Sequence, residues 1–364
     1  MASQQHLALL LSAAGAPLEL GKRATPTPGP GQVLIRNKAV ALNPIDGIIA
    51  KTGFILGEFG WPVILGQDGA GDIVALGEGV TGWKVGDRVF YQSNIEKDRA
   101  TFQEFAIADA ARIARIPEKL SYADAATLPL TIATAAIAAY KPRGDKLAKA
   151  GQDIGGAGLT APWEEGGRGK YAGQPALITS GSSSVGQYAI QLAKLGGFNP
   201  IITTASKHNE VYCKSAGATH VLDYHEVPYS EFRSAVAKII GDTPLTYVYD
   251  AISTPESQKA GWEALSPGGA LVIVKHPSDA VAGKQGKDDA EGKRVVWAFG
   301  GANVPFPGHR EFGTAMYAVL TDMLEKGEIK TNKVEIIGHG LEVIPAGLEK
   351  LQKGVSGVKL VATL

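Results

Sequence analysis

The sequence predicts an α/β protein: a β-barrel-like domain interrupted by an inserted domain with a doubly wound parallel sheet. Residues 7–130 consist of short apolar runs separated by Gly and Pro, whereas residues 176–299 alternate short apolar runs with helical patterns. Short strand patterns return after residue 335. Short strands separated by frequent Gly and Pro turns are typical of β-barrels, and strand–helix alternation is typical of a parallel sheet. We expect one domain to comprise residues 1–130 and 330–364, and the other residues 131–329.

Composition excludes several classes of function. The chain has 364 residues, 36 basic and 36 acidic side chains and a pI near 7.1, so neither nucleic acid nor an anionic membrane surface is an expected partner. Cys213 is the only cysteine, which rules out an internal disulfide and a cysteine-based zinc cluster and is consistent with the cytoplasm. Leu7–Leu11 resembles the apolar core of a secretion signal, but no Lys or Arg precedes it, so we predict a hairpin strand there.

The barrel-like part begins with that hairpin, in which Leu7–Leu11 pairs with the segment Pro17–Leu20. Further strands are predicted where apolar residues follow Gly or Pro turns, and one strand should run into a short helix. These segments are Gln32–Arg36, Leu42–Ala50 (the strand and helix), Asp72–Leu76 and Arg88–Phe90.

Residues 121–140 are rich in alanine and predict helix. Ser121 is a candidate N-cap, and Pro129 should divide the segment into two helices because proline lacks the amide hydrogen that a helix interior needs. Residues 143–173 are dominated by Gly, Lys, Glu and Asp and predict a polar surface excursion with Trp163 as its packing anchor.

Residues 176–205 predict a strand–helix–strand unit, which is the strongest functional signal in the chain. A buried strand, Ala176–Thr179, leads through a small-residue turn, Ser180–Gly186, into a helix that ends at Gly196, and Pro200–Ala205 is the next strand. Such a unit directs the helix N-terminus at the turn, where a phosphate binds. The turn lacks a GxGxxG pattern, so an ordinary βαβ unit is the alternative.

The alternation continues to residue 326, and short strands and one helix are expected in the tail. The expected helices are Glu210–Ala216, Tyr229–Ile240, Gln258–Leu265, Phe312–Lys326 and Ala346–Leu351, and the expected strands are His220–Asp223, Leu245–Asp250, Gly269–Lys275 and Val295–Phe299.

The residues that follow the predicted strand Pro200–Ala205 indicate which cofactor binds. NAD-binding Rossmann units place an acidic residue there for the ribose hydroxyls, whereas this chain has Ser206 and Lys207 and no acid before Glu210. A lysine and a serine would bind a 2′-phosphate that a carboxylate would repel. We therefore expect NADPH as the cofactor, with a solvated surface lysine as the alternative reading of Lys207.

Motifs along the whole chain resemble those of the medium-chain dehydrogenase/reductases. Each motif is modest alone, but their order and spacing together are specific. They are Pro28–Val33, Asn43–Asp46, Leu65–Gly71, Val85–Val89, Phe102–Phe105, Ala125–Pro129 and the unit around Ser180–Gly186. The resemblance implies a GroES-like β-barrel domain plus an inserted Rossmann domain.

Within that family the chain resembles the zinc-independent, quinone oxidoreductase-like branch. Zinc enzymes carry a Cys near Asn43–Asp46 and a His-Glu pair after Gly66, where this chain has Gln67 and Asp68. The serine-rich turn and the cluster Ser206–Asn209 are similar to those of fungal trans-acting enoyl reductases and ToxD-like proteins. This implies that NADPH delivers hydride to an α,β-unsaturated carbonyl, without a metal.

The resemblance also implies positions for the site residues. The expected pyrophosphate contacts are Ser182, Ser183, Ser184 and Val185, and those of the adenosine 2′-phosphate end are Ser206, Lys207, His208, Asn209 and Tyr224. Val358 and Lys359 should approach the cofactor, and Phe299 and Gly300 should lie by the nicotinamide ribose. Residues expected to line the reaction cleft are Asn43, Ile45, Asp46, Gly47, Ile48 and Thr134. Of these, Asn43, Ile48 and Thr134 are the catalytic candidates, and Ile45, Asp46 and Gly47 are expected to contact the cofactor.

Ile48 departs from the family pattern, because many relatives have Tyr or Lys at this place. The proton would then come from solvent or Lys51. The expected substrate is an enone, a quinone or a carrier-bound enoyl group, with a polyketide synthase carrier domain as a possible partner. Two alternatives stay open: an NADPH quinone reductase, and an NADPH-binding partner protein with little turnover.

Overall fold

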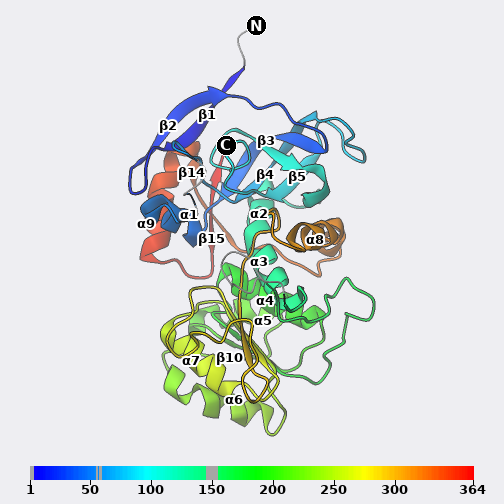
Figure 1. The fold of residues 1–364 in the computed structure, drawn as a ribbon, viewed down its shortest axis with the longest axis vertical. Helices are drawn as coiled ribbons and strands as arrows, with labels where there is room; N and C mark the ends of the chain where they lie inside the picture. Colours follow the sequence, from blue (N-terminus) through cyan, green and yellow to red (C-terminus); the bar gives the residue numbers. More distant parts are fainter. Residues whose placement is uncertain (1–3, 55, 57–59, 145–154) are drawn as a thin grey trace.

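Two large β-sheets, a separate hairpin and the surrounding helices form the elongated molecule in the computed structural model (Figure 1). The structure describes residues 4–54, 56, 60–144 and 155–364. Part of the predicted polar excursion, residues 145–154, therefore lies outside the described residues.

A seven-stranded sheet, mostly antiparallel, and a separate hairpin make up the upper half of Figure 1. The hairpin, β1 (Gln5–Leu11) and β2 (Leu18–Ala24), confirms the predicted N-terminal pair. The sheet order is β14-β15-β3-β4-β5-β7, with β6 also pairing with β3. Its strands are β3 (Gln32–Ala41), β4 (Asp68–Leu76), β5 (Arg88–Gln92), β6 (Phe105–Asp109), β7 (Ile113–Arg115), β14 (Val334–His339) and β15 (Lys359–Thr363).

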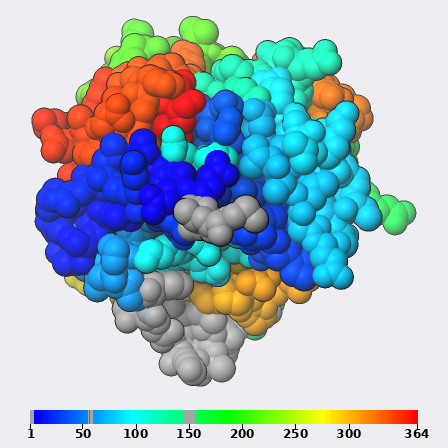
Figure 2. Space-filling model, turned by 90° about the horizontal axis from the view of Figure 1, so that it is seen from above, coloured from blue at the N-terminus to red at the C-terminus, as the bar shows by residue number. Residues whose placement is uncertain are grey.

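Strands from both ends of the chain meet in this sheet. C-terminal β15 pairs antiparallel with β3 at Val361↔Ala41, and parallel with β14. Figure 2 shows the same proximity on the surface, where the orange and red C-terminal residues lie beside the blue N-terminal ones. Helices α1 (Pro44–Thr52) and α9 (Ile344–Lys353) pack against each other at this side, where Gly47 faces the side chain of Gln352.

The second sheet is parallel, as predicted, and has six strands in the order β10-β9-β8-β11-β12-β13. Strand order reverses direction at β8, which is the point where doubly wound sheets bind ligands. The strands are β8 (Ala176–Thr179), β9 (Ile201–Thr204), β10 (His220–Leu222), β11 (Tyr247–Asp250), β12 (Ala270–Ile273) and β13 (Arg294–Trp297). The helices along this part of the chain are α4 (Ser184–Leu195), α5 (Glu210–Ala216), α6 (Phe232–Ile240) and α7 (Pro255–Ala264).

Two consecutive helices, α2 (Tyr122–Ala126) and α3 (Pro129–Tyr140), connect the two sheets. Ser121 caps α2 by accepting a hydrogen bond from the backbone N–H of Asp124, and the break falls at Pro129, so both predictions are confirmed. Residues 122–140 are long and apolar enough to cross a membrane, but 78% of the most apolar window is buried inside the protein. The segment is therefore a core element rather than a clear membrane span.

The remaining long helix, α8 (His309–Glu325), follows the parallel sheet in sequence but packs on the upper half (Figure 1). Thr321 donates a hydrogen bond to the backbone oxygen of Arg115, and Lys119 donates to that of Glu325. Trp163 packs edge-on against Tyr140 and Phe312, as its predicted anchoring role requires. Tyr171, which the sequence did not single out, is a second anchor because its ring stacks on Phe198 at 4.6 Å.

Candidate active site

The turn between β8 and α4 has the geometry of a phosphate-binding turn. Ser183 is the N-cap of α4, and its hydroxyl accepts a hydrogen bond from the N–H of Gly186 at 3.0 Å. Ser180 has a φ of 52°, which is unusual for a residue other than glycine and bends the chain sharply after β8. Ser182, Ser184 and Val185 are half-buried around the helix N-terminus. Backbone N–H groups at this end can therefore reach an anion.

Two glycines bring the helix close to the sheet at this turn. A Cβ on Gly181 would lie 2.2 Å from Thr203 Oγ1, and one on Gly186 would lie 2.2 Å from the backbone oxygen of Ser180. Neither position tolerates a side chain without movement of its neighbours. These are the tight-turn and close-packing roles that glycines have in Rossmann units.

The expected 2′-phosphate residues lie together at the ends of β9 and β10. Ser206 and Tyr224 share a hydrogen bond of 2.8 Å between their hydroxyl oxygens, and Lys207 is exposed beside them in a short 3₁₀ turn, Lys207–Asn209. The carboxylate of Asp223, which sequence reasoning missed, accepts a hydrogen bond from the backbone N–H of Lys207 at 3.0 Å. Hydrogen bonds from the backbone and ring of His225 are the main reason that the pKa of Asp223 is below its usual value.

The C-terminal segment reaches across to this turn. Ser356 Oγ lies 3.0 Å from His208 Nε2 and accepts a hydrogen bond from Asn209 Nδ2 at 2.8 Å. Gly357 allows the approach, because a Cβ there would lie 2.6 Å from Asn209 Oδ1. Val358, which follows, is half-buried. The segment that carries Val358 thus lies beside the expected cofactor residues His208 and Asn209, although Ser356 itself was not singled out in the sequence.

A buried polar cluster joins α1, β4, β15 and α3. The Lys359 ammonium donates to Asn43 Oδ1 and forms an ion pair with Asp68 Oδ2 at 3.1 Å. Asp68 also accepts hydrogen bonds from Asn43 Nδ2 at 2.8 Å and from the backbone N–H of Leu130 at 2.6 Å. Asn43, Asp68 and Lys359 are at most 4% exposed, so both polar atoms of the Asn43 side chain are engaged within the protein.

Asp46 lies next to this cluster and is fully buried. Its Oδ2 accepts a hydrogen bond from the backbone N–H of Asn43 at 2.9 Å, which caps α1. Burial is the main cause that raises the pKa of Asp46 to about 7, and the nearby charge of Asp68 adds to it. Asp46 is therefore a buried, titratable helix cap, and its expected contact with the cofactor stays a prediction.

Thr134 and Gly300 are in direct contact. The Thr134 hydroxyl donates to the backbone oxygen of Leu130 at 2.7 Å, and a Cβ on Gly300 would lie 2.0 Å from Thr134 Oγ1. Phe299, the preceding residue, packs against the ring of Phe306 at 4.9 Å. Two of the sequence-predicted groups, the cleft residue Thr134 and the loop Phe299–Gly300, are thus adjacent in space.

Apolar and aromatic side chains lie on and just beyond α1. Ile48 is 48% exposed, and Ile45 is half-buried against the core of the upper half. Phe54, just beyond α1, meets the ring of His276 at 6.2 Å, and His276 meets Trp297 at 4.4 Å. This row of rings connects the two halves of the molecule, and nothing in the sequence pattern pointed to it.

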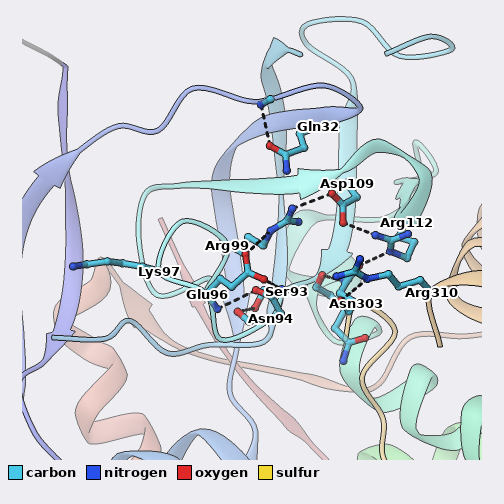
Figure 3. Close-up of polar contacts among 12 residues, drawn as sticks. Gln32, Ser93, Asn94, Glu96, Lys97, Arg99, Asp109, Arg112, Asn303 and Arg310 are labelled. Carbon is cyan, nitrogen blue, oxygen red and sulfur yellow. Dashed lines mark hydrogen bonds and ion pairs between the residues drawn. The ribbon is translucent and has the colours of Figure 1, made fainter. Parts of the chain in front are cut away.

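The loop after β13 is also held to the upper half by charged residues (Figure 3). Asn303 Oδ1 accepts a hydrogen bond from Arg112 Nε at 2.6 Å, and its backbone oxygen accepts one from Arg310. Arg112 and Arg99 both pair with Asp109. Although burial opposes ionisation, these arginines hold the pKa of the Asp109 carboxyl below its usual value.

Comparisons with known proteins agree with this architecture. Residues 29–118 match the alcohol dehydrogenase GroES-like domain, and residues 184–303 match the zinc-binding dehydrogenase family. A trans-enoyl reductase, grgB, from a Penicillium species is 31% identical over 93% of this chain and 92% of its own length. The quinone oxidoreductase of Coxiella burnetii (25% identity, TM-score 0.70) and the enoyl reductase CurK (23%, TM-score 0.75) each align over at least 99% of both chains.

One of these families is described as zinc-binding, but the side chains present here do not fit a zinc site. No group of three or more His, Cys, Asp or Glu side chains is arranged to hold a metal among the residues that the structure describes. Asn43 and Asp68, which lie in the segments where the resemblance places the metal motifs, both contact Lys359. A buried ammonium next to the carboxylate is an unfavourable neighbour for a divalent cation.

Proposed function

We propose, from the premise that this chain belongs to the medium-chain dehydrogenase/reductase family and is an oxidoreductase, that it reduces the C=C bond of an α,β-unsaturated carbonyl with NADPH and without zinc. The observation that carries the proposal is the buried Asn43–Asp68–Lys359 cluster, because Asn43 and Asp68 lie in the segments where the family resemblance places the metal motifs. Hydride addition to an enone spreads negative charge over an enolate, which hydrogen bonds can stabilise without a Lewis acid.

Bound NADPH would supply a hydride from nicotinamide C4 to the β-carbon, and a proton from solvent or a protein group would complete the product at the α-carbon. The protein itself would bind the cofactor and the substrate and orient them relative to each other. The turn Ser182–Val185 would hold the pyrophosphate, and Lys207 with Ser206 and Tyr224 would hold the 2′-phosphate. Such alignment of two reactants can lower a barrier by roughly 7–11 kcal/mol.

The cleft side chains would serve the substrate. Thr134 lies against Gly300 and would face the nicotinamide end, while exposed Ile48 and Phe54 would cover the enone and exclude water. An apolar wall suits an enoyl chain better than a small hydrophilic ketone. Asn43, committed to Lys359 and Asp68, would act by holding the cleft floor in place.

A quinone reductase is the second candidate. The aromatic row Phe54–His276–Trp297 favours it, because planar rings stack on aromatic side chains. Enoyl groups carried on a polyketide synthase carrier domain are a third form of substrate, supported by the similarity to trans-enoyl reductases. All three forms are consistent with a cytoplasmic enzyme.

NADPH oxidation, followed by absorbance, distinguishes these candidates. The substrates are a 2-alkenal, an enoyl thioester, the same enoyl group on a carrier domain, 1,4-naphthoquinone and a simple ketone, with NADH and a chelator as controls. We expect turnover of the alkenal or thioester with NADPH and no effect of the chelator. Exclusive turnover of naphthoquinone would replace the proposal with the quinone reductase. Silence with all five substrates despite NADPH binding would favour a partner protein with little turnover.

A further inference from the structure

Gln92, at the end of β5, connects the two halves of the molecule. It is 2% exposed, and its side-chain Nε2 donates to the backbone oxygen of Gly300 at 2.8 Å, while its Oε1 accepts from the N–H of Ala302 at 2.9 Å. Its own backbone oxygen accepts from Asn303 Nδ2 at 2.6 Å, and its N–H donates to the Tyr317 hydroxyl at 2.8 Å. One buried residue of the upper sheet thus fixes three residues of the loop after β13.

Asn303 provides a second attachment of the same loop. Its Oδ1 accepts from Arg112, whose guanidinium is held in turn by Asp109 (Figure 3). The loop starts from β13, where the N–H of Ala298 donates to the backbone oxygen of Ile273 at 2.7 Å. It therefore begins on the parallel sheet and is bonded to the barrel-like half at Gly300, Ala302 and Asn303.

The attached loop also contacts α3 directly, through Gly300. With no room for a Cβ against Thr134, the Gly300 backbone lies directly on α3. The Gln92 amide matches the Gly300 carbonyl and the Ala302 N–H simultaneously, so it defines the position of this loop segment against α3. A shift of the loop would leave buried polar groups unpaired, which is unfavourable.

We propose that Gln92 is a positioning residue that sets where the Phe299–Gly300 loop holds the nicotinamide end of the cofactor relative to the substrate. This inference rests on the proposed function. It predicts that loss of the amide impairs hydride transfer far more than cofactor affinity, because the adenosine and pyrophosphate residues lie elsewhere on the parallel sheet.

The test compares Gln92→Leu and Gln92→Glu with wild type in steady-state kinetics. In Gln92→Glu the side chain keeps its length and the oxygen that accepts from the Ala302 N–H, but it loses the N–H group that donates to the Gly300 carbonyl. We expect kcat to fall by about 10- to 100-fold in Gln92→Leu, since a misplacement near 1 Å costs about that much, with the KM for NADPH changing less than about threefold. The Glu variant should change in the same direction, and it carries the test if the Leu variant does not fold.

Gln103→Leu is the matched control. Gln103 is also fully buried, but its side chain bonds to His6, Arg23 and the backbone of Lys97 and Ala100, all within the upper half. The Gln103→Leu substitution should lower the midpoint of unfolding while leaving kcat of the folded enzyme unchanged. Equal kcat values for the folded Gln92 and Gln103 variants would overturn the proposal.

A binding measurement separates failure of this inference from failure of the proposed function. Reduced nicotinamide fluoresces more strongly when it is immobilised out of water, so bound NADPH can be examined without any substrate. We expect a smaller fluorescence gain at saturation in Gln92→Leu than in wild type or Gln103→Leu, even if no enone is turned over. A wild-type fluorescence gain in both Gln92 variants would contradict the positioning role, whatever the activity panel gives.

Discussion

Lys207 and Asp223 place opposite charges at the turn expected to bind the adenosine end of the cofactor. Asp223 is already engaged by the backbone N–H of Lys207 and by His225, whereas the Lys207 side chain is exposed. A 2′-phosphate would therefore find an ammonium and the hydroxyls of Ser206 and Tyr224. The expected preference for NADPH depends mainly on this one lysine.

Lys207→Glu should shift the preference from NADPH towards NADH, because a carboxylate repels the 2′-phosphate and can bond ribose hydroxyls. The dissociation constants of both cofactors, measured by fluorescence titration, check this. Lys214→Glu, at an exposed lysine of α5 that pairs with Glu210, is the control and should leave the ratio unchanged. Unaltered NADPH affinity in Lys207→Glu would show that the 2′-phosphate assignment is wrong.

Asp46 should make stability depend on pH. Its pKa is raised to about 7 in the folded protein, so the folded state holds a proton that the unfolded chain releases near pH 4. The contribution is fully present below about pH 4 and is lost as pH rises towards 7, at up to about 1.4 kcal/mol per pH unit.

Urea unfolding between pH 4.5 and 7.5 measures this effect in wild type and Asp46→Asn. The stability of wild type relative to the variant should decline as pH rises. Asp109→Asn is the control, because the pKa of Asp109 is lowered and its contribution is lost only below about pH 4. A constant difference between wild type and Asp46→Asn would contradict the buried, titratable assignment.

Individual site residues were only partly predictable. The sequence placed Ser183 in a small-residue turn before a helix and Thr134 near a helix joint, because such turns and proline breaks are local signals. It assigned Lys359 to the cofactor, but its partners Asn43 and Asp68 lie hundreds of positions away and no local pattern encodes that contact. Gln92 was missed for the same reason. The cofactor roles of the predicted residues stay predictions.

Among the helices and strands, local sequence signals predicted several boundaries correctly. Strand β8 and helix α5 have the predicted bounds, and the two helices of residues 121–140 separate at Pro129. Strand β3 extends five residues beyond the predicted Arg36, because pairing with β15 continues as far as Ala41. Pairing with a strand that is distant in sequence therefore sets the end of β3, which local periodicity does not predict.

The Asp68–Lys359 pair links four elements, and its removal should be costly. Lys359→Met leaves a buried carboxylate unpaired and should destabilise the protein by about 3–5 kcal/mol in urea unfolding. The double variant Asp68→Asn/Lys359→Met should recover part of this loss, because no uncompensated charge is then buried. Additive losses in the double variant would show that the two side chains do not interact.

For the whole molecule, the sequence predicted the order of a barrel-like part, a parallel sheet and a return to short strands. The structure adds how the parts are joined: β15 enters the first sheet beside β3, and α8 crosses back onto the upper half. Neither contact has a sequence signal, since each depends on surfaces that exist only after folding. Gln92 and Ser356 belong to these same connections between the halves.

The proposed reaction is hydride transfer from NADPH to an enoyl group, and an isotope experiment tests it most directly. The enzyme is incubated with a 2-enoyl thioester and NADPH deuterated at both C4 positions, with and without chelator, and the product is analysed by mass spectrometry and NMR. Our account predicts one deuterium, on the β-carbon of a saturated thioester, in equal yield with chelator. Deuterium on the carbonyl carbon, or activity lost to chelator and restored by zinc, would contradict it.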